Sequence, residues 1–99
     1  MIKRGLAEFI GTFFLCLLVC MTLMSKHPEF FPFAAGFIYL AMIYANGHIS
    51  GAHFNPMISV AILIRGKMQL SLVPIYILSQ MFAAAMAGMV SLLLWSGKQ

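Results

Sequence analysis

Few residues in this chain can do chemistry, and most of them fall in one short polar segment. Residues 46–56 read Asn-Gly-His-Ile-Ser-Gly-Ala-His-Phe-Asn-Pro, inside an uncharged run from Phe30 to Ile64. Amide, imidazole and hydroxyl groups at this density can donate and accept hydrogen bonds. His48 and His53 have no acid or cysteine beside them, so we expect backbone-bonded loop residues rather than metal ligands.

The composition excludes most soluble functions. Hydrophobic residues make up 63% of the 99 positions, and only six basic and two acidic side chains are present. No nucleophile–base pair, phosphate loop or metal-ligand spacing occurs, so we expect no enzyme activity, no cofactor and no metal. Cys16 and Cys20, four residues apart, are interpreted as packing or lipid-facing residues. The net charge of +4 comes from residues that flank apolar runs, which indicates a lipid bilayer as partner and no nucleic acid.

The apolar runs predict a single transmembrane domain over residues 1–99, with spanning helices at 6–24, 30–45 and 70–95. The first helix covers about 28 Å, close to the hydrocarbon core of about 30 Å. A secretory signal is the other reading of the N-terminus, but Glu8 and the missing cleavage site favour a retained helix. We expect a multi-pass integral protein of a plasma or inner membrane.

The segment 46–64 predicts a re-entrant loop followed by a half-helix. Asn55 to Ile64 gives only about 15 Å of helix, with Asn55 as its cap and Pro56 at its first position. Residues 65–67, Arg-Gly-Lys, end it at a water interface, so its start points into the membrane. Residues 46–54 would then dip to the midplane as non-helical backbone. The alternative is a tight loop between helices.

A half-helix that starts at mid-membrane places unpaired N–H groups and positive dipole charge there, while the loop before it exposes carbonyl oxygens. A passive channel for neutral polar solutes needs this pairing of donors and acceptors.

Residues 47–57, Gly-His-Ile-Ser-Gly-Ala-His-Phe-Asn-Pro-Met, resemble the first-repeat signature of the aquaporin and aquaglyceroporin family, the major intrinsic proteins. Residues 7–12 and 79–84 resemble the family's first and third helices. The resemblance covers the N-terminal half of a usual member, which implies a half-aquaporin. The implied fold is an all-α membrane protein with three transmembrane helices plus one re-entrant half-helix, equivalent to one inverted repeat.

The resemblance also implies residue roles in a pore. Asn55 would donate its amide to the permeant, and the carbonyls of Gly51, Ala52 and His53 would form an acceptor ladder. Met57 stands where the family usually has alanine, which adds bulk where two half-helices would meet.

Three further residues are candidates for bracing the loop: Glu8, Gln80 and His48. Glu8 resembles the family's buried acid, although it could instead lie at the headgroup boundary near Lys3 and Arg4. Gln80 either braces the loop or only packs between helices.

The family's selective constriction has an arginine three residues after the second-repeat asparagine, and that offset falls on Ile58 here. The equivalent helix positions fall near Ala35 and Ile43. These apolar residues predict a pore that favours glycerol-like or other small neutral solutes, with proton exclusion left to the paired dipoles. Arg65 is interpreted as snorkelling to the interface.

A single half-helix leaves a polar loop open to lipid, so a partner is required. We expect a homo-oligomer, an inverted dimer with dual topology, and four such dimers by analogy with the family. Basic residues number four at one membrane face and two at the other: Lys3, Arg4, Arg65 and Lys67 against Lys26 and Lys98. One alternative is a non-conducting subunit that needs a different partner half. Another is a dual-topology exporter, but such exporters rely on an acid at mid-membrane, and Glu8 lies too near the terminus for that.

Overall fold

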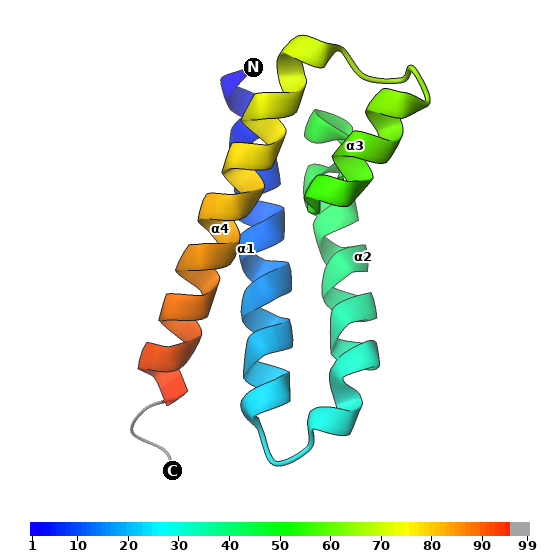
Figure 1. The fold of residues 1–99 in the computed structure, drawn as a ribbon. Helices are drawn as coiled ribbons and strands as arrows, with labels where there is room; N and C mark the ends of the chain where they lie inside the picture. Colours follow the sequence, from blue (N-terminus) through cyan, green and yellow to red (C-terminus); the bar gives the residue numbers. More distant parts are fainter. Residues whose placement is uncertain (96–99) are drawn as a thin grey trace.

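The structure, a computed structural model, describes residues 1–95. Its helices are α1 (Ile2–Met24), α2 (Phe31–Ser50), α3 (Pro56–Ile64) and α4 (Val73–Trp95), with 3-10 turns at Pro28–Phe30 and Leu70–Leu72. Three helical segments, 2–24, 28–50 and 70–95, are long and apolar enough to cross a membrane. The expected all-α fold of three spans and one short helix is confirmed over the described residues (Figure 1).

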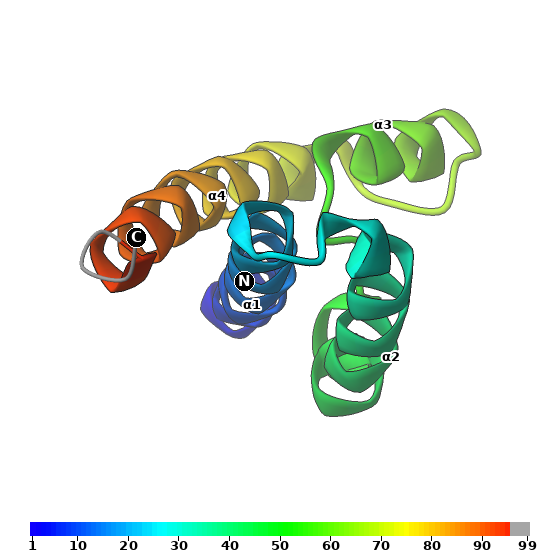
Figure 2. The same cartoon turned by 90° about the horizontal axis from the view of Figure 1, so that it is seen from below.

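Helix α1 lies at the centre of the bundle and packs against both α2 and α4, while α3 packs against α4 (Figures 1 and 2). The N-terminus and the α3–α4 connection share one end of the bundle, and the α1–α2 turn lies at the other (Figure 1). Helix α3 therefore starts part-way along the bundle and ends at the N-terminal end (Figure 1).

The buried residues are largely polar, and the exposed ones are largely apolar. The largest fully buried side chains are Gln80, Glu8, Ser59 and Ser91, whereas phenylalanine, leucine and methionine side chains cover the outside. Ala83 and Ala87 are completely buried, which lets the helices approach closely. This distribution fits a surface that meets lipid and an interior that holds the polar groups.

Two helix ends differ from expectation by four residues or more. Helix α2 continues to Ser50 rather than ending at Ala45, so only residues 51–55 are non-helical. The polar residues Asn46 and Ser50, one helical turn apart, are buried, and the helix keeps its own backbone paired until Gly51 ends it at φ 90°. Helix α1 begins at Ile2 instead of residue 6.

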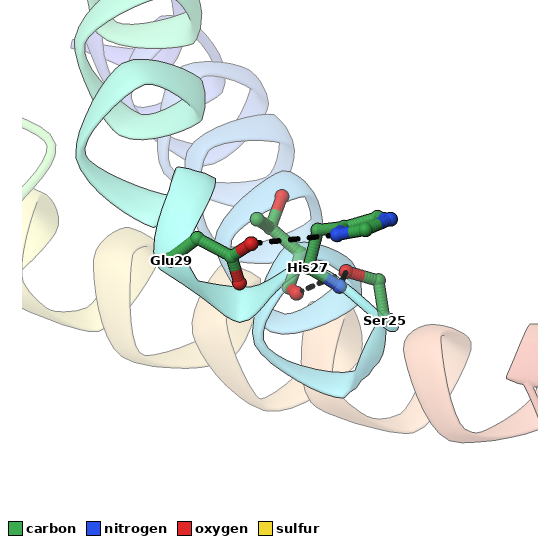
Figure 3. A network of polar contacts seen from close by, with 4 residues as sticks. Ser25, His27 and Glu29 are labelled. Atoms are coloured by element: carbon green, nitrogen blue, oxygen red, sulfur yellow. Dashed lines mark hydrogen bonds and ion pairs between the residues drawn. The ribbon is translucent and has the colours of Figure 1, made fainter.

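Polar side chains form the α1–α2 turn, as Figure 3 shows. The backbone N–H of His27 donates to Ser25 Oγ at 3.1 Å, and His27 Nδ1 lies 3.4 Å from Glu29 Oε2. The His27 and Glu29 side chains are both more than half exposed, which suits a turn in water. The turn returns the chain as an antiparallel helix beside α1.

Candidate pore loop

Asn55 caps the start of α3 with its side-chain oxygen. Asn55 Oδ1 accepts a hydrogen bond of 2.9 Å from the backbone N–H of Met57, and Pro56 occupies the first turn. This is the predicted cap. Because the cap uses the oxygen, the Nδ2 amide of the exposed Asn55 is left as a donor at the tip of the half-helix.

The loop before Asn55 turns its donors and its acceptors toward different helices. Ala52 and Phe54 both have positive φ, 60° and 57°, a conformation that non-glycine residues rarely adopt. The backbone N–H groups of His53 and Phe54 point to Glu8 in α1. The carbonyl oxygens of Ala52 and His53 point to the hydroxyl of Tyr39 in α2. The loop therefore has one acceptor side and one donor side.

Glu8 holds the donor side of the loop. Its Oε2 accepts from the backbone N–H of His53 at 3.1 Å and from Ser50 Oγ at 2.7 Å. Its Oε1 accepts from the backbone N–H of Phe54 at 2.8 Å and from Gln80 Nε2 at 2.7 Å. All four contacts are acceptances, as an acceptor-only carboxylate requires.

The Glu8 side chain that makes these contacts is fully buried in protein. Gln80 is 1% exposed and also bonds the brace, since its Nε2 donates to Ser59 Oγ at 3.1 Å as well as to Glu8. Ser59 Oγ lies 2.8 Å from His53 Nδ1. Helices α1, α3 and α4 thus all hold one loop.

Most of the residues expected to line a pore are at least partly exposed, whereas His53 is only 6% exposed. Met57 is 78% exposed and Ile58 40%, at the tip of α3. Ile43 is 41% exposed on α2, and Ala35 is half-buried. Gly51 is exposed and Ala52 half-buried in the loop.

The position of His48 differs from the one expected for a residue that braces the loop. It lies exposed in the last turn of α2, and within residues 1–95 its side chain makes no hydrogen bond to the loop. The reason is the longer α2, which keeps residue 48 in a helix and turns its side chain away from the buried polar core.

Four polar partners of the loop escaped the sequence analysis: Tyr39, Ser50, Ser59 and Tyr76. Tyr76 donates to the Ser50 carbonyl at 2.6 Å and is buried. A serine or tyrosine inside an apolar run is too common to identify a partner. Spacing gives one signal for Tyr39. It lies one helical turn from both Ala35 and Ile43, so it shares the helix face that is expected to line the pore.

Residues 1–99 match the family model described as Major intrinsic protein. The chain belongs to the major intrinsic protein family. Like its aquaporin relatives it is a multi-pass membrane protein, in agreement with the three membrane-spanning segments of the structure.

Curated plant relatives support this assignment. The chain is 36% identical to Aquaporin NIP1-1 of Zea mays over 104 aligned residues, which cover 98% of the chain and 37% of that relative. It is 38% identical to Aquaporin NIP1-4 of Oryza sativa subsp. japonica, covering 94% and 36%, and 31% identical to Nodulin-26 of Glycine max, covering 97% and 38%. The chain spans about a third of the length of these curated relatives.

Proposed function

We propose that this chain forms half of a passive membrane channel for water or small neutral solutes such as glycerol, and that a second, inverted copy supplies the other half. The supporting observation is the tip of α3, which lies part-way along the bundle (Figure 1). The cap there uses the side-chain oxygen of the exposed Asn55 and leaves its amide as a donor. Two such Asn-Pro-Met tips would meet at the membrane midplane.

The loop chemistry suits a neutral permeant. The carbonyls of Ala52 and His53 lie on the side of the loop away from Glu8, and each carbonyl oxygen has two lone pairs, so one stays free for a permeant. Such acceptors replace part of a solute's hydration shell. The positive dipole ends of two half-helices would repel cations and protons.

A second copy would cover what one chain leaves open. Lipid penalises an unpaired amide such as that of Asn55, and Met57 and Ile58 stand exposed beside it. A two-fold axis in the membrane plane would bring both tips together.

The charges permit this inverted insertion. Lys3, Arg4, Arg65 and Lys67 belong to the N-terminal end of the bundle, and Lys26 follows α1 at the other end. Lys98, counted at that second face, lies outside the described residues. Four basic residues against two give only a modest orientation bias. Four inverted pairs per assembly is the arrangement we infer by analogy.

The constrictions at either mouth would be apolar. Ile58, Ala35 and Ile43 lack the guanidinium that the family's arginine would provide, so we propose a preference for glycerol-like solutes over water alone. Fast water flux with no glycerol flux would contradict this preference.

Osmotic-shock light scattering on proteoliposomes that contain only this chain tests conduction. We expect faster volume changes than in empty vesicles for both water and glycerol gradients. Empty-vesicle rates at a verified protein content would reject self-sufficient conduction, and would favour the alternative, a non-conducting subunit that needs a different partner half.

Disulfide cross-linking tests the inverted pair itself. In a background with Cys16 and Cys20 changed to alanine, Met57→Cys should form a dimer on mild oxidation, because the two tips meet at the axis. Ile64→Cys is the matched control, since it is equally exposed, 79% against 78%, but lies at the surface end of α3. Dimers with Ile64→Cys and none with Met57→Cys would exclude an axis at the tip.

A further inference from the structure

Tyr39 lies between two residues of α2 that the proposed function places in the pore. Ala35, Tyr39 and Ile43 follow one another at intervals of four residues, so they share one face of the helix. The same face continues to Gly47, where an added Cβ would lie 3.7 Å from Cβ of Ala52. This row of residues therefore runs along α2 to the acceptor side of the loop.

The Tyr39 hydroxyl is bonded to the acceptors of the loop. It donates to the His53 carbonyl at 2.7 Å and lies 3.4 Å from the Ala52 carbonyl oxygen. The Tyr39 ring packs at a tilt on Phe54, with ring centroids 5.7 Å apart. Phe54 is 2% exposed, whereas Tyr39 is only half-buried. One contact of the ring is therefore buried, while the residue as a whole stays partly exposed.

We propose that Tyr39 sets the rate of permeation by occupying the His53 carbonyl, an acceptor that a permeant needs on its way past the loop. This inference rests on the proposed channel. While Tyr39 donates to one lone pair of this oxygen, a water or alcohol hydroxyl reaches only the other, and the carbonyl is fully available only when the Tyr39 hydroxyl leaves. The hydroxyl of residue 39 therefore acts as a barrier, and the ring sets the width beside it.

The competing role for Tyr39 is purely structural, as a support for the strained loop. The two roles predict opposite signs. Removal of a barrier raises flux, whereas removal of a support loosens the loop, lowers the melting temperature and lowers flux. The ring is retained in Tyr39→Phe, so its contact with Phe54 is kept and only the hydroxyl is tested.

The experiment compares wild type, Tyr39→Phe and Tyr44→Phe in proteoliposomes under an osmotic gradient. Tyr44 is the matched control, because it lies on the same helix and is 80% exposed. We expect water permeability per chain to rise about 2- to 10-fold in Tyr39→Phe, the range set by the net strength of one hydrogen bond. Tyr44→Phe should equal wild type.

A second variant keeps the experiment decisive if Tyr39→Phe fails to fold. Difluorotyrosine at position 39, assayed at a pH low enough to keep its more acidic phenol protonated, makes the hydroxyl a stronger donor, so permeability should fall below wild type. Unchanged or reduced flux in Tyr39→Phe, or unchanged flux with difluorotyrosine, overturns the role of Tyr39 while the channel proposal stands. If neither wild type nor Tyr39→Phe conducts, the channel proposal fails and this inference fails with it. If only Tyr39→Phe conducts, the result supports the hydroxyl as a barrier.

Discussion

Changing Glu8 to glutamine should release the pore loop while it preserves the size of the side chain. If the new amide NH2 stands at Oε2, the Ser50 hydroxyl can rotate to accept from it, but the backbone N–H of His53 faces a donor. If it stands at Oε1, the backbone N–H of Phe54 faces a donor, whereas Gln80 can turn its unpaired Oε1 to accept from the new amide. Either orientation therefore leaves one backbone N–H of the loop without an acceptor.

The cost follows from the bonds that change, and it is the same in either orientation. An unpaired buried N–H costs about 1–3 kcal/mol, and each remaining bond loses about 1 kcal/mol when its acceptor becomes neutral. The total, about 3–5 kcal/mol, is a large share of a typical stability of about 5–15 kcal/mol. Because each 1.4 kcal/mol is tenfold, amide exchange at His53 and Phe54 should accelerate about 100- to 4,000-fold.

Hydrogen exchange in lipid vesicles, resolved at these two amides, measures this release. Glu29→Gln is the matched control, because Glu29 is the only other acid in the sequence and its side chain is 65% exposed in the α1–α2 turn. Exchange at His53 and Phe54 that is as slow in Glu8→Gln as in Glu29→Gln would refute the reasoning that one carboxylate holds the loop.

Two further changes test the packing and the cap. Gly11→Ala would bring a methyl group to 2.1 Å from the buried Phe54 ring, so it should destabilise the fold by about 1–3 kcal/mol, whereas Gly88→Ala, with nothing within 4 Å, should be neutral or stabilising. Thermal unfolding in detergent compares the two, and equal melting temperatures would contradict the close contact. Asn55→Ala removes the cap to the Met57 N–H and should cost about 1 kcal/mol. Amide exchange should then rise at Met57 but not at Phe54, and a rise at both would mean that the cap also holds the loop.

The half-helix illustrates how far local signals reach. Asn-Pro at 55–56 and Arg-Gly-Lys at 65–67 predict its ends, and the structure has α3 at Pro56–Ile64 with Asn55 as the cap. The predicted end of the second span at residue 45 is wrong by five residues, because α2 continues to Ser50. The polar segment that follows residue 45 predicts a loop, whereas its first five residues are helical. Polarity alone does not distinguish a loop from a helix whose polar face is buried.

The partners of the loop depend on contacts that no local pattern encodes. Glu8 bonds residues 45 and 46 positions away, and Gln80 reaches it from 72 positions away. Glu8 was a candidate only because of a resemblance, and its alternative at the headgroups was equally compatible with its position in the sequence.

The amino-acid order by itself determined the three spans and the short helix α3. Length and hydropathy suffice for this, because lipid forces every exposed backbone group to pair within its own helix. Tertiary structure alone decided which polar groups meet. The packing of α1 between α2 and α4 puts a carboxylate on one side of the loop and a tyrosine hydroxyl on the other. Hydrogen bonds of this kind require atoms within about 3 Å, and only the packed helices fix positions that closely.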